Sequence, residues 1–597
     1  MIGPVLPSSG VSTPLGLDAV RPAPGFWGDR IGLNREVTLA HCRERMEREG
    51  WIANFRGELP RRGRESSDAE VYKLLEGLAW ADHPALPELA GVVARAQEAD
   101  GYLNTRWKHA RYTDFEWGCE LYCHGHLIQA GIARLRTHGE DELTQVARRA
   151  ADHVCDRFMD TAETCGHPVV ETALVELYRA TGVERYLEMA RRFVERRGLP
   201  ALGDVEFGRG HFQDDVPVRR ASVFRGHAVR ALYLACGVVD VAVETGDAGL
   251  LEAVEAQWAA TVARRTHLTG GMGSRHFGES FGEDFELPPD RAHAETCAGI
   301  ASFMLAHRLL LATGDVRHAD LAERTLYNVL ATSPAPDGES FFAANPLQAR
   351  TPAERAPWSA AACCPGNLAR TFAALPAYLA AADGAGVRIH HHTPAEIRHA
   401  GLVLKVETGY PWSGRVAVTV AERGTGPIAL RVPSWAVGAT LSYGETRRVV
   451  APGYAVAEVD GGWRPGDVIT LDLPVVSRWT VPDARIDALR GSVAVERGPL
   501  VYCAESAGDD PPLARVVVRP DAAVEHVVDG AVELDVKAAL ISGAPTGWPY
   551  TAEMETPDEE PITLRLVAYH RWGEHGPATM RVWLPVDTAR SRYLEEV

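Results

Sequence analysis

Four residues with metal-binding or nucleophilic side chains stand in two short motifs. Glu295 and Cys297 are two positions apart, and Cys363 is followed directly by Cys364. Pro365 suits the first turn of a helix, and a helix N-terminus favours a thiolate over a thiol. Three thiolates and one carboxylate can hold a zinc ion tetrahedrally. Because the spacing is not the usual Cys-x-x-Cys pair, buried free cysteines and a vicinal disulfide remain alternatives.

Acidic side chains crowd a glycine-rich segment shortly before the first motif, where each could serve as a general acid or base. The candidates are Glu279, Glu283, Asp284 and Glu286. Residue type and spacing do not choose among these four, so the proton-transferring carboxylate stays open at this level.

Several histidines also have side chains that could bind a ligand. Three of them follow a glycine in a helix-opening context, namely His126, His167 and His227. A lone histidine is more often a structural residue than a ligand. The run His390-His391-His392 resembles a metal cluster, but it lies where a strand should begin. Since strand alternation sends its members to opposite faces, we expect no metal there.

The motifs as a set resemble glycoside hydrolase family 127, which is typified by bacterial β-L-arabinofuranosidases. The resemblance is carried by Gly270-Gly271-Met272-Gly273, Glu279, Glu295-Thr296-Cys297 and Cys363-Cys364-Pro365-Gly366-Asn367. Further matches follow in fixed order at residues 100–105, 125–128, 166–168, 226–228, 345–347, 410–412 and 498–502. Because the matches span most of the chain, the resemblance is specific.

This resemblance implies a role for each candidate residue. A zinc ion would be held by Glu295, Cys297, Cys363 and Cys364. Cys363 would also be the nucleophile, and Glu279 the general acid and base. The histidines assigned to substrate hydroxyls are His126, His167 and His227. Most retaining glycosidases pair two carboxylates, so a zinc-bound thiolate would here replace the attacking one.

The predicted function is therefore a retaining glycoside hydrolase that releases a terminal sugar, with β-L-arabinofuranose as the first candidate. Two residue choices depart from the family pattern. Ala343-Ala344 stand where an aromatic residue often closes on the sugar, and Gly366 replaces an expected second proline. The first departure leaves another furanoside or an unusual plant-derived sugar as an alternative substrate. A non-catalytic glycan-binding protein or a structural zinc protein is the alternative from another class.

The elements that must position these residues are helical up to about Ala382. Apolar residues recur at helical spacing, as in Leu174, Leu177 and Tyr178, and Thr313-Gly314-Asp315 indicates a tight turn between helices. The predicted helices are 34–50, 70–80, 84–96, 119–137, 143–158, 170–181, 184–196, 227–245, 248–266, 292–312, 318–332 and 368–382. Such consecutive hairpins predict an (α/α)6 barrel. A linear helical solenoid is the alternative, which the absence of a fixed-period repeat disfavours.

After Asp383 the chain becomes rich in short β-forming segments. Leu402–Thr408 and Arg415–Ala421 alternate apolar and polar residues, and Pro465-Gly466-Asp467 is a turn signal. We predict a catalytic barrel over residues 1–382 and two jelly-roll-like β-sandwiches over residues 383–486 and 487–597. The first ~15 residues are free to join the first sandwich, given the usual error of such boundaries.

Composition restricts the partners and the compartment. The net charge of −18 argues against nucleic acid or an anionic membrane, and a neutral oligosaccharide or glycoside fits it. No signal peptide is recognisable, and the most apolar helical stretch is interrupted by His and Arg, so we expect a cytoplasmic protein without a membrane span. The ten cysteines are scattered, unlike a disulfide framework. A homodimer is an assembly that the sequence allows.

Overall fold

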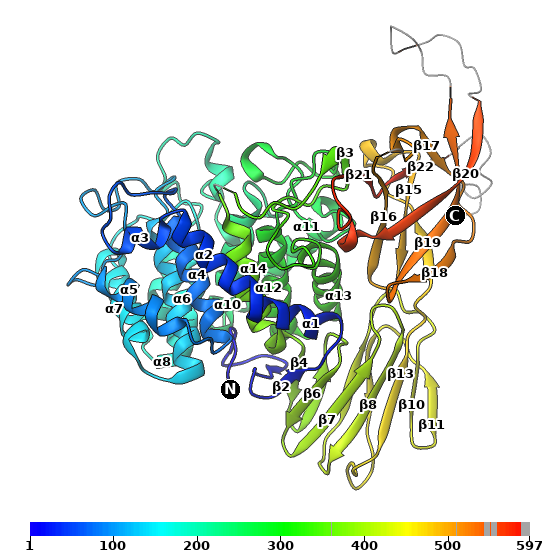
Figure 1. The fold of residues 1–597 in the computed structure, drawn as a ribbon. Coiled ribbons are helices and arrows are strands. Elements are labelled where there is room, and N and C mark those ends of the chain that lie inside the picture. The colour runs from blue at the N-terminus through cyan, green and yellow to red at the C-terminus, as the bar shows by residue number, and fades with distance from the viewer. Residues whose placement is uncertain (360, 509, 543–549, 551–557, 587–597) are drawn as a thin grey trace.

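The fold is described by a computed structural model that covers residues 1–597 except 360, 509, 543–549, 551–557 and 587–597. A helical domain comes first along the chain, and two β-sheet domains follow it (Figure 1). This order is the predicted one. The structural statements below concern the described residues.

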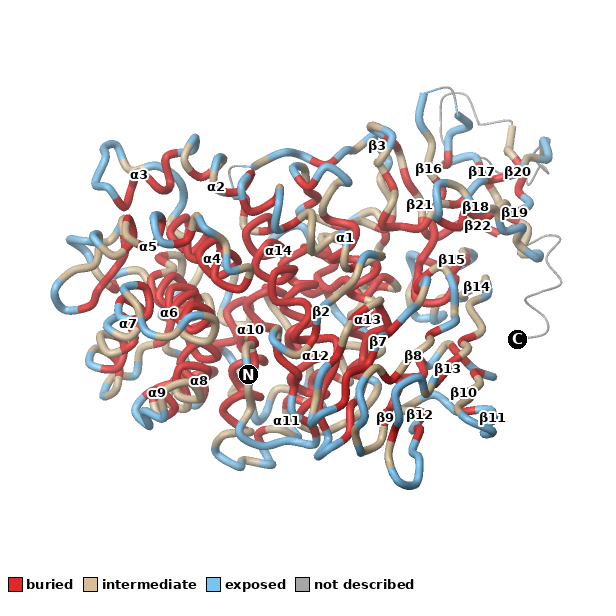
Figure 2. The backbone as a smooth tube through the Cα atoms, turned by 60° about the horizontal axis from the view of Figure 1, so that its bottom comes forward, coloured by how far each residue is buried: buried red, intermediate tan, exposed pale blue. Residues whose placement is uncertain are grey.

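Six helices form a closed inner ring. They are α4 (Ser67–Trp80), α6 (Glu120–His138), α8 (Val170–Thr181), α10 (Ala228–Thr245), α12 (Thr296–Thr313) and α14 (Cys363–Ala374). Each of them packs against the next, and α14 closes the ring on α4. All residues of α4 are buried, because the outer helices cover its other face (Figure 2). The closed ring confirms the (α/α)6 barrel and excludes a linear solenoid.

The outer layer pairs one helix with each inner helix. It consists of α2 (Leu39–Arg48), α5 (Leu86–Arg95), α7 (Glu142–Phe158), α9 (Glu184–Arg196), α11 (Ala248–Arg265) and α13 (Val316–Thr325). Two shorter helices, α1 (Phe26–Leu33) and α3 (Trp51–Phe55), complete the domain within the described residues. The outer helices are amphipathic, as expected for helices with one face in water: in α9, Tyr186, Met189, Ala190 and Phe193 are buried at helical spacing.

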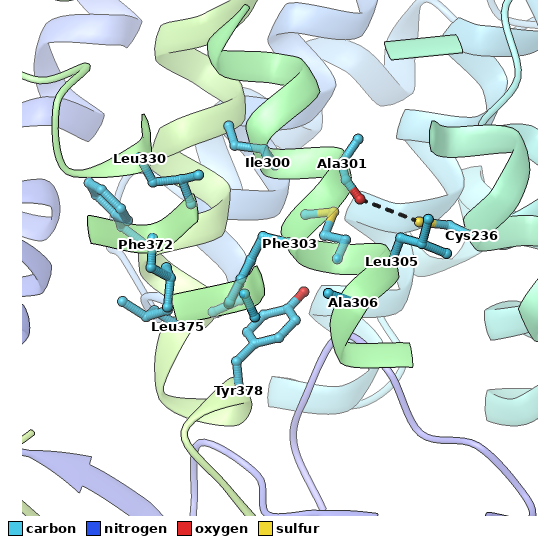
Figure 3. Close-up of a cluster of buried hydrophobic side chains, with 14 of the residues drawn as sticks. Cys236, Ile300, Ala301, Phe303, Leu305, Ala306, Leu330, Phe372, Leu375 and Tyr378 are labelled. Atoms are coloured by element: carbon cyan, nitrogen blue, oxygen red, sulfur yellow. Dashed lines mark hydrogen bonds between the residues drawn. The ribbon is translucent and has the colours of Figure 1, made fainter. Parts of the chain in front are cut away.

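The middle of α12 packs against neighbouring elements on two sides. Phe303 of α12 packs on Tyr378 with ring centroids 4.8 Å apart, and Phe372 of α14 lies in the same cluster (Figure 3). On the other side, the Cys236 thiol of α10 lies 3.8 Å from the Ala301 carbonyl oxygen (Figure 3). The inner helices are thus fixed against one another along their length.

Helix α12 is also the one described helix that is long and apolar enough to cross a membrane. Its 18-residue window, Thr296–Thr313, has a mean hydropathy of 1.3. The His and Arg residues in this window therefore lower its hydropathy less than we predicted. However, 89% of that window is buried inside the protein. Length and composition alone cannot separate a membrane span from such a core helix.

The last predicted helix differs from the structure at both ends. We predicted residues 368–382, whereas α14 begins at Cys363 and the residues from Ala380 to Asp383 form strand β4. Cys363 and Cys364 are therefore the first residues of the helix and do not precede it. The alanine-rich end is a strand because it pairs with β5 (Gly386–Ile389) and with the N-terminal β1 (Thr13–Pro14). The β1 partner is distant in sequence, whereas β5 follows β4 directly and forms a hairpin with it.

The first β domain consists of two sheets. One has the order β1-β4-β5-β9-β12, in which β9 is Ile428–Val432 and β12 is Gly453–Ala457. The other has the order β11 (Thr446–Val449), β10 (Thr440–Tyr443), β13 (Val468–Asp472), β8 (Arg415–Glu422), β7 (Leu402–Thr408), β6 (Ala395–His399) and β2 (Val20–Pro22). Strand β8 buries every second residue, so its other face can meet water. Two N-terminal strands, β1 and β2, join these sheets.

In the part of the second β domain that the structure describes, the strands form one branched sheet. Its main path is β14 (Ser477–Thr480), β15 (Ser492–Arg497), β16 (Leu500–Ser506), β20 (Glu559–Ala568), β19 (Ala531–Ile541) and β17 (Val516–Val518). Off this path lie β18 (Val524–Val528), β21 (Ala578–Arg581) and β22 (Leu584–Pro585). Strand β21 also pairs with β3 (Gln348–Ala353), which comes from the loop between α13 and α14. The second β domain thereby supports a loop of the helical domain.

A buried ion pair joins the helical domain to the first β domain. Arg431 of β9 is fully buried and pairs with Glu323 and Asp320 of α13, the latter at 2.7 Å. The Tyr410 hydroxyl donates to Glu323 over 2.7 Å. Because the charges compensate one another, these polar groups can be buried at the domain junction.

Candidate active site

The Glu295–Cys297 and Cys363–Cys364 motifs meet at the N-terminal ends of two inner helices. Glu295 is the residue before α12, Cys297 is in its first turn, and both cysteines of the second motif open α14. One ligand atom from each residue lies within 4.8 Å of the others. The N-terminal dipoles of both helices favour negative charge at this point.

The distances between the sulfur atoms test whether a metal ion fits between these residues. The Sγ atom of Cys364 lies 3.5 Å from that of Cys297 and 3.7 Å from that of Cys363. A tetrahedral zinc ion with Zn–S bonds of ~2.3 Å requires separations of about 3.7–3.8 Å between sulfur ligands. A vicinal disulfide would need about 2.05 Å, so the structure excludes it. The four residues therefore fit a tetrahedral metal site.

Electrostatics point the same way. Burial raises the pKa of Glu295 well above its ordinary value, and the hydrogen bond to Cys297 raises that of Cys364 likewise. Hydrogen bonds from its neighbours lower the pKa of Cys297 to about 6, and the same interaction raises that of Cys363 to about 12. The protein alone cannot hold four negative charges here. A bound cation would let all four groups ionise.

A buried cation lies behind this cluster. Lys73 of α4 is fully buried and contacts Glu70 at 2.9 Å. The charge of Lys73 lowers the pKa of both Cys297 and Cys363, although it is not the largest influence on either. Gly366 of α14 packs against this pair: a Cβ atom there would lie 3.5 Å from the Lys73 Cβ and 3.6 Å from the Glu70 Oε2. The sequence analysis did not identify Lys73, since nothing local links it to the cysteines.

Glu279 is the acidic candidate that reaches the metal cluster. It forms a second group with His227 and Glu295, with one atom of each within 4.8 Å of the others. The other three candidates lie in ion pairs with arginines: Glu283 with Arg265, Asp284 with Arg264 and Arg265, and Glu286 with Arg275. Residue type and spacing left this choice open, the family resemblance implied Glu279, and the path of the loop brings Glu279 to the cluster.

Glu279 has a strained backbone conformation, and a hydrogen bond fixes its side chain. Its backbone φ is +49°, a left-handed value that non-glycine residues rarely adopt. Oε2 accepts a hydrogen bond of 3.0 Å from Nε2 of His227. This bond lowers the pKa of Glu279 to about 2, so the carboxylate is the resting form. The side chain remains 49% exposed and can meet a ligand.

The three predicted sugar-binding histidines lie close together. The rings of His167 and His227 are 6.0 Å apart, and Tyr122 packs on His126 and His167 at 4.6 and 4.1 Å. Burial lowers the pKa of all three, which keeps them neutral. Both ring nitrogens of His126 and Nδ1 of His227 are buried and have no hydrogen-bond partner among the residues that the structure describes. Neutral imidazoles with unused nitrogens suit the hydroxyl groups of a sugar.

His390, His391 and His392 are placed elsewhere. They lie directly after β5, and the Tyr454 hydroxyl and the Arg431 carbonyl oxygen contact His390 and His392 at 2.5 and 2.8 Å. They are not part of any group in the described residues that could hold a metal. The run lies after the strand and not in it, so the expected alternation does not apply, and the absence of a metal site here stays a prediction.

His293 belongs to the site and was missed by the sequence analysis. Its Nε2 atom lies 3.9 Å from Oε2 of Glu295 and 4.0 Å from Oε1 of Glu279. Its Nδ1 atom lies 3.2 Å from Nδ1 of His276. Burial lowers the pKa of His293 to about 4. Its only sequence signal is its position two residues before Glu295.

Two cavities adjoin these residues. One of about 840 Å³ is lined by the loop on both sides of Glu279, including Gly278 and Ser280, and by Phe207 and His211. The other, of about 330 Å³, is lined by Cys363 and by Ala343 and Ala344. The alanines that depart from the family pattern thus border the nucleophile candidate and leave space beside it.

Comparisons with known proteins cover nearly the whole chain. Residues 19–377 match the domain described as "Beta-L-arabinofuranosidase, GH127 catalytic domain", residues 386–475 the GH127 middle domain and residues 477–585 the GH127 C-terminal domain. A non-reducing end beta-L-arabinofuranosidase of Bifidobacterium longum subsp. longum is 32% identical over 586 residues, covering 86% of this chain and 88% of the relative.

Two solved structures are similar over their full length. The GH127 beta-arabinofuranosidase BT3674 has a TM-score of 0.88 and 30% identity, covering 96% of this chain and 98% of that one. Ara127N-Se, a GH127 beta-L-arabinofuranosidase from Geobacillus stearothermophilus T6, has a TM-score of 0.88 and 29% identity, covering 95% and 100%.

Proposed function

Because the chain belongs to glycoside hydrolase family 127, we propose that it removes a terminal β-L-arabinofuranose with retention of anomeric configuration. The proposal assigns Cys363 as nucleophile, Glu279 as general acid and base, and zinc as the metal. One observation supports it: the Cys363 thiol and the Glu279 carboxylate each lie within 4.8 Å of Glu295, in one partly open site.

Glu295, Cys297, Cys363 and Cys364 would hold the zinc. When bound, zinc keeps the sulfur ionised at neutral pH and fixes its direction. The chain supports a closed, four-ligand site, because Cys297 and Cys364 are only 3% and 1% exposed. The Glu295 carboxylate has one oxygen, Oε1, 3.3 Å from the Cys363 sulfur, while Oε2 faces away toward His293.

Cys363 is the cysteine best placed to attack. It is half-buried, whereas the other two cysteines of the cluster are buried, so a substrate can reach it. Attack by its sulfur on the anomeric carbon would break the bond to the leaving oxygen and form a glycosyl-cysteine. Release of the sugar would then need water and a base.

Glu279 would transfer the proton in both steps. In the second step its carboxylate, which is the resting form, takes a proton from water. In the first step it must be protonated. A bound sugar would cover this half-exposed side chain, and the lost hydration would raise its pKa toward the protonated form. Substrate binding itself would thus prepare the acid.

His126, His167 and His227 would bind the hydroxyl groups of the sugar. Their neutral rings can donate or accept, and fixing the sugar in one orientation brings the anomeric carbon to Cys363. The space beside Ala343 and Ala344 favours a second candidate function, in which the same residues act on a bulkier furanoside or another unusual plant-derived sugar.

A panel of aryl furanosides and pyranosides tests both candidates. We expect the highest kcat/KM on the β-L-arabinofuranoside, and NMR in the first minutes should show the retained anomer. Faster turnover of another furanoside would select the second candidate. An inverted first product would exclude the covalent mechanism, and no turnover of any glycoside by zinc-loaded protein would favour a binding or structural role.

A further inference from the structure

His293 stands between the two carboxylates of the site, and its ring is held in place. The Nε2 atom is buried and has no hydrogen-bond partner within the described residues. The backbone around it is clamped by Asn345, whose N–H donates to the His293 carbonyl over 3.1 Å and whose side-chain amide donates to Ala294 over 2.9 Å. Buried side-chain nitrogens are nearly always hydrogen-bonded, so an unpaired one in a fixed position calls for an explanation.

The surrounding charges determine which nitrogen of His293 carries the proton. Nε2 faces Oε1 of Glu279 at 4.0 Å and Oε2 of Glu295 at 3.9 Å. A lone pair pointing at Oε1 of the Glu279 carboxylate would be repelled, so the proton belongs on Nε2. Nδ1 then accepts the 3.2 Å hydrogen bond from Nδ1–H of His276. His276 thus holds the ring in the tautomer that points N–H at the carboxylates.

The distances suit one shared oxygen atom. Polar atoms about 4 Å apart are too far for a direct hydrogen bond, but both can bond to one oxygen placed between them. Oε2 of Glu295 is also buried and has no hydrogen-bond partner in the described part of the chain. Glu279 receives the His227 hydrogen bond on Oε2, which leaves Oε1, the atom facing His293, for proton transfer. These three atoms therefore lie around one position that a water oxygen can occupy.

We infer that His293 positions the water that releases the sugar from Cys363. This inference rests on the proposed function. The water would donate one proton to Oε1 of Glu279 and a hydrogen bond to Oε2 of Glu295, and it would accept a hydrogen bond from Nε2–H of His293. Its remaining lone pair forms the new C–O bond as the C–S bond to Cys363 breaks, and the electron pair of that bond returns to sulfur. All four tetrahedral directions of the water are then used.

Steady-state and burst kinetics on 4-nitrophenyl β-L-arabinofuranoside test this role. With such a good leaving group the first step is fast, so kcat reports the second step and kcat/KM the first. His293→Phe should lower kcat about tenfold, as expected for one lost hydrogen bond to a reacting group. KM should fall with it, kcat/KM should stay unchanged, and the 4-nitrophenol burst should become more pronounced.

Two further variants separate positioning from a structural effect. His293→Gln places an amide N–H near the same point and should recover most of kcat. His276→Ala leaves the metal ligands untouched and should lower kcat by a smaller factor at unchanged kcat/KM. Zinc content measured on every variant should equal that of the wild type.

The outcomes are distinguishable. If the wild type turns over but kcat is unchanged in both His293→Phe and His276→Ala, the inference is wrong and the proposed function stands. A fall in kcat/KM equal to that in kcat, or His293→Gln no better than His293→Phe, also overturns it. If the zinc-loaded wild type cleaves no glycoside, the proposed function fails and the inference fails with it.

Discussion

The sulfur of Cys363 lies 3.3 Å from Oε1 of Glu295, although the two residues are 68 positions apart in the chain. The contact exists because α12 and α14 are neighbours in the inner ring and begin at the same end of it. It places a candidate nucleophile next to a candidate metal ligand, close enough for their charges to interact. Different variants can test the chemistry of this cluster and the stability of the fold.

Cys363→Ser should abolish turnover, because a serine hydroxyl is a far poorer nucleophile at neutral pH than a thiolate. Cys364→Ser should weaken metal binding while leaving the nucleophile in place. The activity of each variant must be compared with its metal content, because both cysteines belong to the same candidate metal site. Cys236→Ala is a matched control, a buried cysteine outside the cluster, and should keep both. Full activity of Cys363→Ser would remove Cys363 from its role.

Purified protein should contain about one zinc ion per chain, with Zn–S distances of ~2.3 Å by X-ray absorption. Removing the ion with a chelator should abolish activity and lower Tm, because four acidic groups would then be buried without a cation. Adding zinc back should restore both. Protein prepared without chelators that contains no transition metal would contradict the assignment.

Glu279→Gln should affect substrates according to their leaving groups. Glycosides with poor leaving groups need protonation and should lose ~10²–10⁴-fold in kcat/KM, the usual range for a lost general acid. Activated aryl glycosides should keep most of kcat/KM, although their kcat should fall because water attack lacks a base. Glu283→Gln, in the same loop but in an ion pair with Arg265, is the control and should change neither value. An equal loss on both kinds of substrate would argue against acid catalysis.

The pH profile should depend on the bond between His227 and Glu279. That bond lowers the pKa of Glu279 to about 2, so its carboxylate persists into acid solution. In His227→Phe the pKa should rise toward the ordinary value of ~4.3. The acid limb of kcat on an activated aryl glycoside, which reports the base, should therefore move to higher pH. An acid limb that stays in place would show that Glu279 does not limit this step.

Arg431→Met should destabilise the protein by ~3–5 kcal/mol, because Glu323 and Asp320 would lose their buried counter-ion. Burial already raises the pKa of Glu323, and Arg431 opposes that rise. Denaturant unfolding measures the loss. Arg398→Met breaks the exposed pair with Glu396 in the same domain and should cost ~0–1 kcal/mol. Equal effects of the two variants would mean that the junction pair is not a stabilising contact.

The sequence by itself was enough to predict the helical and β-rich parts and their order. Hydrophobic periodicity and turn residues are local signals, and they marked the inner and outer helices of the barrel closely enough to count the hairpins. The motif set also identified the family, because several short motifs in fixed order are specific. Local patterns failed at the end of α14, where β4 exists only because β1 and β5 pair with it.

Tertiary structure alone decided how the site is assembled. Four acidic residues of one loop were equivalent by residue type and spacing. The family resemblance implied Glu279, and the path of that loop brings its side chain to His227. Lys73 and His293 carried no recognisable motif, since their partners come from other helices and loops. The free state of Cys363 and Cys364 likewise depended on the distance between their sulfurs. Chemistry at a site depends on distances of a few ångströms between residues remote in sequence, and closure of the helical ring sets those distances.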